Sequence, residues 1–115
     1  VHPYFPQTEI LARHRELGII TEAWSPLGRG SDLLENPVVA EVANDHGITA
    51  AETVLAWHAA VGTVPLPKAS SRDRQTQNLA AIDIALDAAS VERLTALARE
   101  DGRVFGGDPL THRDV

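Results

Sequence analysis

Two short apolar runs, 18–23 and 62–67, alternate along this chain with longer segments of helical periodicity. Both runs contain β-branched residues, and each meets proline too soon to continue as a helix, so each predicts a strand, the first of them buried. Apolar residues at helical spacing predict helices over 8–17, 50–61 and 90–98, and capping signals predict two more over 37–46 and 72–78. This alternation is typical of βα units and predicts an α/β fold with parallel strands.

The predicted helices carry recognisable start and stop signals. Asn36 before Pro37 is a typical start, and Thr49 with Glu52 forms a capping box. The predicted N-terminal caps are Thr8, Asn36, Thr49, Ser71 and Ser90, and the predicted stops are Gly18 and Gly47. On the first helix, Ile10, Leu11, His14 and Leu17 share one helical face.

Composition excludes several classes of protein. A net charge of −6 argues against a nucleic-acid partner, and no apolar run approaches the ~20 residues that cross a bilayer. The absence of cysteine excludes disulfides and fits a cytoplasmic protein. His14, His46 and His58 lie on predicted helices without partners at metal-ligand spacing, so we expect no metal site.

The chain has 115 residues, contains no methionine and begins at Val1. We therefore expect it to have been cut from something longer. Two parallel strands do not close a sheet, and both outer edges would be left open.

A cluster of polar and basic residues follows the second predicted strand. Lys68 comes directly after the strand, and Ser70, Ser71 and Arg74 lie at or near the start of the next helix. Backbone N–H groups and the helix dipole favour an anion there, and Arg74 can bind a phosphate with two parallel hydrogen bonds. Gln77 and Asn78 lie one turn further on, within reach of an adenine edge. The alternative is ordinary helix capping with solvated charges.

A second candidate loop follows the first predicted strand. Trp24 stands at its end, where an aromatic ring can stack on a planar ligand, and the glycines of 25–30 permit a close backbone approach. The alternative is a core tryptophan. Both loops lie at the carboxyl ends of parallel strands, where ligands bind in α/β folds.

Three segments together carry a family resemblance: His2-Pro-Tyr4, Glu22-Ala-Trp-Ser-Pro-Leu-Gly-Arg-Gly30, and Pro67-Lys68 followed by Arg74 and Asn78. In this order and spacing they resemble the aldo-keto reductases, most closely bacterial members such as the 2,5-diketo-gluconate reductases. The likeness extends from Val1 to about Val104. It implies a TIM (β/α)8 barrel that uses NADPH. The chain would begin at the end of the sixth strand and carry the seventh and eighth, with residues 1–100 as barrel fragment and 101–115 as a C-terminal tail facing the substrate.

The resemblance also implies roles for the residues of the two loops. Trp24 would stack on the nicotinamide, and Ser25, Leu27, Gly28 and Arg29 would follow the pyrophosphate. Lys68, Ala69, Ser70, Ser71 and Arg74 would hold the adenosine ribose and its 2′-phosphate, with Gln77 and Asn78 near the adenine. This sequence departs from the family pattern at Ala69, where serine is more usual, and at Gln77, where glutamate is frequent.

The family's catalytic Asp, Tyr, Lys and His lie on earlier strands, and none of their motifs occurs here, so the resemblance implies no catalytic residue in this chain. Tyr4 and His2 belong to a different segment, and Lys68 is the only lysine. The expected function is the cofactor-binding part of an NADPH-dependent reductase of aldehydes or ketones, catalytically incompetent alone. Two alternatives stay open. One is a non-enzymatic half-barrel that self-associates or pairs with a complementary fragment, and the other is an unrelated phosphate-binding α/β domain.

Overall fold

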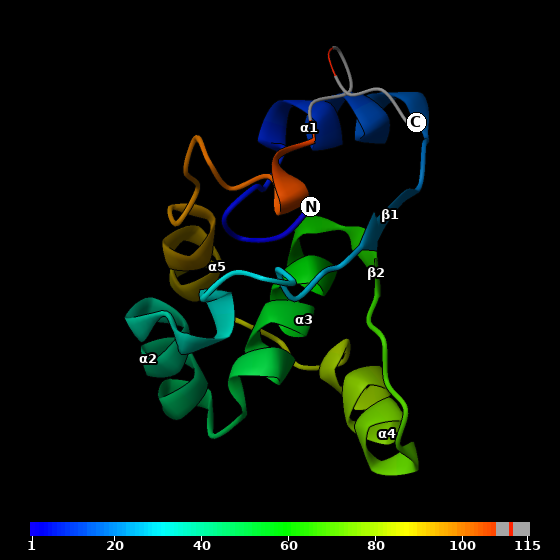
Figure 1. The fold of residues 1–115 in the computed structure, drawn as a ribbon. Helices are drawn as coiled ribbons and strands as arrows, with labels where there is room; N and C mark the ends of the chain where they lie inside the picture. The colour runs from blue at the N-terminus through cyan, green and yellow to red at the C-terminus, as the bar shows by residue number, and fades with distance from the viewer. Residues whose placement is uncertain (108–110, 112–115) are drawn as a thin grey trace.

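The computed structural model describes residues 1–107 and residue 111 (Figure 1). Its elements are α1 (Thr8–Leu17), β1 (Thr21–Trp24), η1 (Leu33–Glu35), α2 (Pro37–His46), α3 (Ala50–Val61), β2 (Thr63–Leu66), α4 (Arg72–Ala81), α5 (Ala88–Thr95) and η2 (Val104–Gly106). The predicted alternation of helices and two strands is confirmed, and the two 3-10 turns were not predicted. Of the predicted tail, 108–110 and 112–115 lie outside the described residues.

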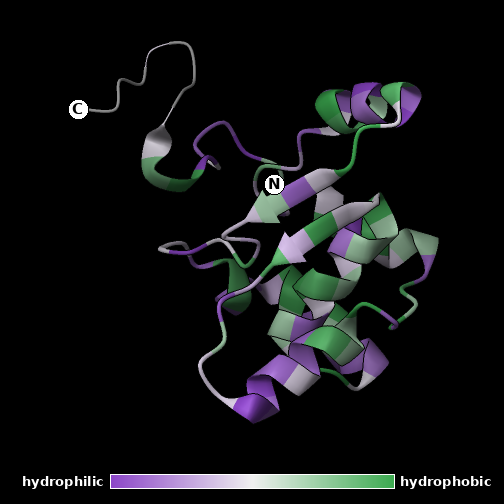
Figure 2. Ribbon diagram, turned by 90° about the vertical axis from the view of Figure 1, so that its right-hand side faces the viewer, coloured by the Kyte–Doolittle hydropathy of each residue, from purple (hydrophilic) through white to green (hydrophobic). Residues whose placement is uncertain are grey.

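The two strands pair in parallel, as predicted. Thr21 lies opposite Thr63 and Trp24 opposite Leu66, so both strands end at the same edge of the sheet. Figure 2 shows the two arrows pointing the same way, with helices behind them. The crossover between them runs through α2 and α3, and α3 packs against β2. The loops that follow β1 and β2 therefore start side by side.

Only one face of this sheet is covered by the described residues. Ala23 and Thr63 are buried, whereas Glu22, Trp24, Val64 and Leu66 are exposed. The prediction of a buried first strand is therefore only half right. Ile20, just before β1, is 77% exposed. The physical reason is that side chains alternate across a strand, and the helices supply a core for one side only.

Three of the five predicted caps are confirmed. Asn36 accepts a hydrogen bond from the Val38 amide at 2.9 Å, Thr49 and Glu52 form the capping box, and Ser71 accepts from the Arg74 amide at 3.3 Å. The predicted stops Gly18 and Gly47 both adopt left-handed backbone angles.

The predictions for Thr8 and Ser90 are wrong. The first helix is preceded by Gln7, whose backbone is left-handed and whose side chain makes no capping bond. Asp87 accepts from the Ser90 amide at 3.2 Å, so the cap lies three residues before the predicted one and the last helix spans Ala88–Thr95. On α1 only Leu11 is buried, whereas Ile10 and Leu17 are 47% and 56% exposed.

The hydrophobic core lies between α2, α3 and α5. Residues 53–58 of α3 are all buried, and Trp57 donates its Nε1–H to the Thr95 hydroxyl at 3.0 Å. The other members of this core cluster are Tyr4, Leu33, Val39, Val42, Val54 and Leu94. None of the helices in the part of the chain that the structure describes is long and apolar enough to cross a membrane.

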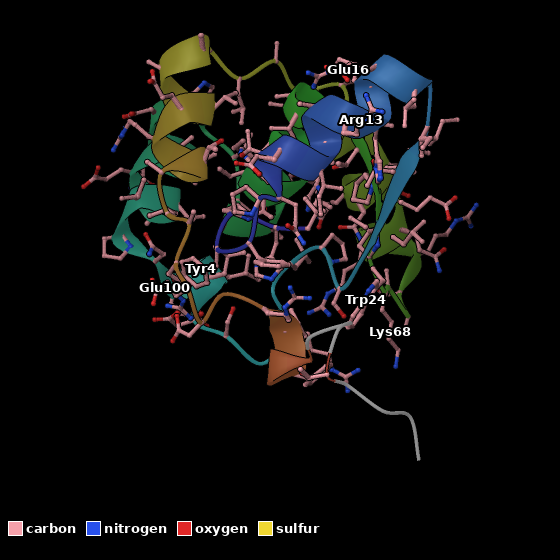
Figure 3. All side chains as sticks on the ribbon, turned by 90° about the horizontal axis from the view of Figure 1, so that it is seen from above. Tyr4, Arg13, Glu16, Trp24, Lys68 and Glu100 are labelled. Carbon is pink, nitrogen blue, oxygen red and sulfur yellow. The ribbon has the colours of Figure 1, made fainter. Side chains whose placement is uncertain are left out.

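Tyr4 connects the N-terminal segment to Arg99 and to the loop after β1. Its buried hydroxyl donates to Asp32 Oδ1 at 2.9 Å and accepts from Asn36 Nδ2 at 3.1 Å. The Arg99 guanidinium lies 3.8 Å from the centre of its ring, and the Arg99 amide donates to the Tyr4 carbonyl at 3.1 Å (Tyr4 is labelled in Figure 3). The far end of the loop is thereby fixed to the N-terminal segment.

His58 is a fully buried histidine near the end of α3. Its Nε2 lies 3.0 Å from the Pro26 carbonyl oxygen, and its Nδ1 lies 2.7 Å from the Thr63 hydroxyl. Burial lowers the pKa of His58 to about 4, although the Pro26 carbonyl partly opposes this shift. Burial also lowers the pKa of His2 to about 4, with the nearby N-terminal charge adding to the effect.

We expect the stability of this fold to fall with pH below about 6.5. There the unfolded chain protonates His58 while the folded chain, with its pKa of about 4, does not. The free energy of unfolding should drop by roughly 1 kcal/mol per pH unit from this residue between pH 6.5 and 4. Urea titrations at several pH values measure it.

The matched control is His58→Gln, which removes this titration. His2 contributes a second slope of the same sign, so the variant should retain part of the pH dependence. A variant with the same pH dependence as the wild type would contradict the assignment to His58.

Candidate cofactor-binding site

The candidate site is formed by the two loops that leave the carboxyl ends of β1 and β2. Trp24 and Leu66 are opposite each other in the sheet, so Trp24 and Lys68 begin neighbouring loops. Figure 3 shows these two side chains on the same side of the molecule. The predicted juxtaposition of the two loops is therefore present.

The loop after β2 is held by the helix that it leads into. The Ser71 hydroxyl caps α4, and the Gln75 side-chain amide donates to the Ala69 carbonyl at 3.2 Å. Gln75 was not among the predicted residues. Its place in the second turn of a capped helix was the available signal, because a side chain there can reach back to the preceding loop.

Three basic side chains surround the start of α4. Lys68, Arg72 and Arg74 are exposed. No ion pair among the described residues involves any of them, whereas Arg13, Arg93 and Arg99 all pair with carboxylates. Their charge adds to the positive end of the helix dipole, and Asp73 in the first turn offsets only part of it. This combination suits a phosphate.

The loop after β1 makes a tight turn. The Gly28 amide donates to the Ser25 carbonyl at 3.0 Å, and Ser25 has a left-handed φ of 46°. Gly28, with φ 66°, is buried, and a Cβ there would lie 2.8 Å from Ser31 Oγ and 3.0 Å from Leu33 Cδ2. Only glycine fits this position, which explains its place in the motif.

Trp24 is not a core residue. It is 62% exposed, and its ring stacks on Phe105 with a centroid distance of 6.3 Å and an interplanar angle of 18°. Both rings line a cavity of about 490 Å³ together with His2, Glu22 and Arg103. The buried tryptophan of this chain is Trp57 instead. Phe105 was missed by sequence reasoning because only the tertiary fold brings the tail to Trp24.

The remaining predicted residues lie in three neighbouring parts of the structure: a groove between β2 and α4, the start of α4, and the loop after β1. Ala69 and Asn78 line a groove of about 700 Å³ between β2 and α4, together with Gln75, Leu79 and Ile82. Lys68, Ser70, Ser71 and Arg74 surround the start of α4, and Gln77 is exposed further along this helix. Ser25, Leu27, Gly28 and Arg29 form the first loop and line neither cavity.

The side chains of His14 and His46 contact other side chains of the protein. His14 Nδ1 lies 2.8 Å from the Thr21 hydroxyl, and His46 lies 3.3 Å from Asp87. Both ring nitrogens of His2 are buried without a hydrogen-bond partner among the residues that the structure describes. Within residues 1–107 and 111, no group of three His, Asp or Glu side chains is arranged to hold a metal ion.

Comparison with known proteins gives consistent results. The model of the aldo/keto reductase family matches residues 1–99. The chain is 44% identical to 2,5-diketo-D-gluconic acid reductase B of Corynebacterium sp. (strain SHS752001), covering 100% of this chain and 41% of that protein. It is 37% identical to morphine 6-dehydrogenase of Pseudomonas putida, again over 100% of this chain and 41% of the relative.

Solved structures agree with the sequence relatives. A variant of Gox0644 in complex with NADPH superposes with a TM-score of 0.88 at 33% identity, covering 99% of this chain and 41% of that one. An aldo/keto reductase from Brucella melitensis gives a TM-score of 0.75 at 35% identity, covering 84% of this chain and 36% of that one. The chain thus spans about two fifths of the length of the relatives it matches. Its sequence, its fold and the match over residues 1–99 show that this chain belongs to the aldo/keto reductase family.

Proposed function

We propose that this chain supplies the NADPH-binding part of an aldo-keto reductase that reduces aldehydes or ketones to alcohols. The observation that carries the proposal is the group of three basic side chains at the start of α4, next to the loop that begins at Trp24. In a complete barrel, β1 and β2 would be the seventh and eighth strands, with residues 1–5 at the end of the sixth.

The residues present fit an extended dinucleotide with a phosphate at one end. Lys68 and Arg74 would supply positive charge for the 2′-phosphate, with Ser70 and Ser71 offering hydroxyls beside it. The 25–29 turn would follow the pyrophosphate, and Asn78 lines the groove beside α4. Trp24 offers an exposed aromatic face to the nicotinamide. When bound, NADPH would supply the hydride.

The protein's own contribution is therefore binding and orientation. The aldo-keto reductase tetrad of Asp, Tyr, Lys and His has no counterpart among these 115 residues, because the only tyrosine is Tyr4 and the only lysine is Lys68. The Tyr4 hydroxyl is bonded to Asp32 and Asn36. We propose that the chain alone binds the cofactor and does not protonate a carbonyl substrate. A cytoplasmic location, expected from the absence of cysteine, belongs to the same proposal.

The basic side chains at α4 should distinguish NADPH from NADH. We expect Arg74→Gln to weaken NADPH binding about tenfold or more, because a charge-assisted contact to phosphate is lost, and to leave NADH binding unchanged. Lys68→Met should likewise weaken NADPH binding and leave NADH binding unchanged. Quenching of Trp24 emission during titration, checked by calorimetry, measures both.

Arg13→Gln is the matched control. It removes the same charge from α1, where Arg13 pairs with Glu16 far from Lys68 (Figure 3), and should leave both affinities unchanged. Equal loss of NADH and NADPH affinity in Arg74→Gln would sink the 2′-phosphate assignment. In the same samples, the chain alone should not oxidise NADPH when an aldehyde is added, and turnover at an enzyme-like rate would contradict the proposed incompetence.

A second candidate function is favoured by the open face of the sheet. Trp24, Val64 and Leu66 are exposed together there, with Ile20 beside them, and each strand has one edge unpaired among the described residues. Such a surface drives association with a complementary barrel fragment or with another copy.

This candidate predicts an assembly. Light scattering should give a molecular mass above the 12.4 kDa of the single chain at high protein concentration. Substituting Leu66→Lys on the exposed face should shift the mass toward the monomer, because charge on that face opposes burial. A wild-type chain that stays monomeric at high concentration counts against self-association.

A further inference from the structure

We propose that His58 is the positioning residue that holds the 25–28 turn in the shape required for the cofactor. The proposal rests on the proposed function, because the 25–28 turn belongs to the NADPH site. His58 lies on α3 and lines neither of the two cavities next to the site. It acts through the Pro26 carbonyl and makes no ligand contact of its own.

The His58 side chain bridges the loop after β1 and the start of β2. One ring nitrogen is 3.0 Å from the Pro26 carbonyl oxygen, two residues beyond β1, and the other is 2.7 Å from the Thr63 hydroxyl, at the first residue of β2. His58, Pro26 and Thr63 are all buried. One side chain therefore fixes the first loop relative to the strand that leads into the second loop.

The bonding partners determine which nitrogen carries the proton. A carbonyl oxygen only accepts, so Nε2 must donate to Pro26, and in the neutral ring Nδ1 then accepts from the Thr63 hydroxyl. The burial that keeps His58 neutral fits this single tautomer. The Thr63 hydroxyl also lies 3.3 Å from the His58 carbonyl oxygen, but the shorter contact to Nδ1 takes its one proton.

The turn needs such a bond because its backbone is strained. Ser25 has a φ of 46°, a left-handed conformation that residues other than glycine rarely adopt. The next residue is Pro26, whose carbonyl is the group that His58 binds. Strained backbone persists where surrounding contacts hold it, and such strain gathers at functional sites. Water cannot easily replace the bond, because both partners are buried.

The test compares two substitutions of similar size. In His58→Gln the side-chain amide can donate to Pro26 and accept from Thr63, whereas His58→Met offers no donor. The loop is read by hydrogen exchange at the Gly28 amide, which bonds to the Ser25 carbonyl, with the Ala40 amide of α2 as an internal reference. NADPH affinity is measured on the same samples.

We expect His58→Met to speed exchange at Gly28 relative to Ala40 by about tenfold or more and to weaken NADPH binding about tenfold, with His58→Gln close to wild type in both. Unchanged exchange and affinity in His58→Met would overturn the proposal, and so would equal damage in His58→Gln. If the wild type binds no NADPH, the proposed function fails, while exchange at Gly28 still decides the role of His58.

A measurement on the wild type covers the case in which His58→Met does not fold. Nitrogen NMR of the His58 ring should show the proton on Nε2, with a hydrogen-bond coupling to the Pro26 carbonyl. A proton on Nδ1 alone would overturn the proposal, because the bond to the turn would then be absent.

Discussion

The parallel pairing of β1 with β2 against α3 is the constraint on which the rest of this structure depends. Parallel neighbours need a crossover, and here α2 and α3 provide it while α3 buries residues 53–58 between the sheet and the other helices. The pairing brings the ends of β1 and β2 to one edge. Every feature of the candidate site follows from that placement, since both loops begin there.

The elements and most caps were predictable because their signals are local. Asn36 before Pro37, the Thr49–Glu52 box and Ser71 each act within three residues of themselves. The errors have two sources. The exposure of Ile20 depends on which face of the sheet receives a core, whereas Asp87 and Ser90 are both plausible caps and the choice between them is local.

The residues of the candidate site also divide into those that the sequence predicts and those that it does not. The basic residues of 68–74 and the loop at Trp24 were visible in the sequence as motifs at strand ends. Phe105 and His58 were not, because each acts on a ring or backbone that only the fold brings near. Gln75 was overlooked although its place on a capped helix was a local signal. The described residues of this chain have two main surface features. One is a candidate dinucleotide-binding surface, and the other is an uncovered apolar face of the sheet. Both features fit a member of the aldo/keto reductase family that spans about two fifths of its relatives.

The most direct test of this account is an NMR titration of the chain with NADPH that follows every backbone amide. We expect concentration-dependent shifts at 25–29 and at 68–78 that saturate together with one affinity, and little change on α1 and α2. Shifts confined to a single loop, or spread over surfaces away from both strand ends, would contradict the claim that the two loops form one cofactor site.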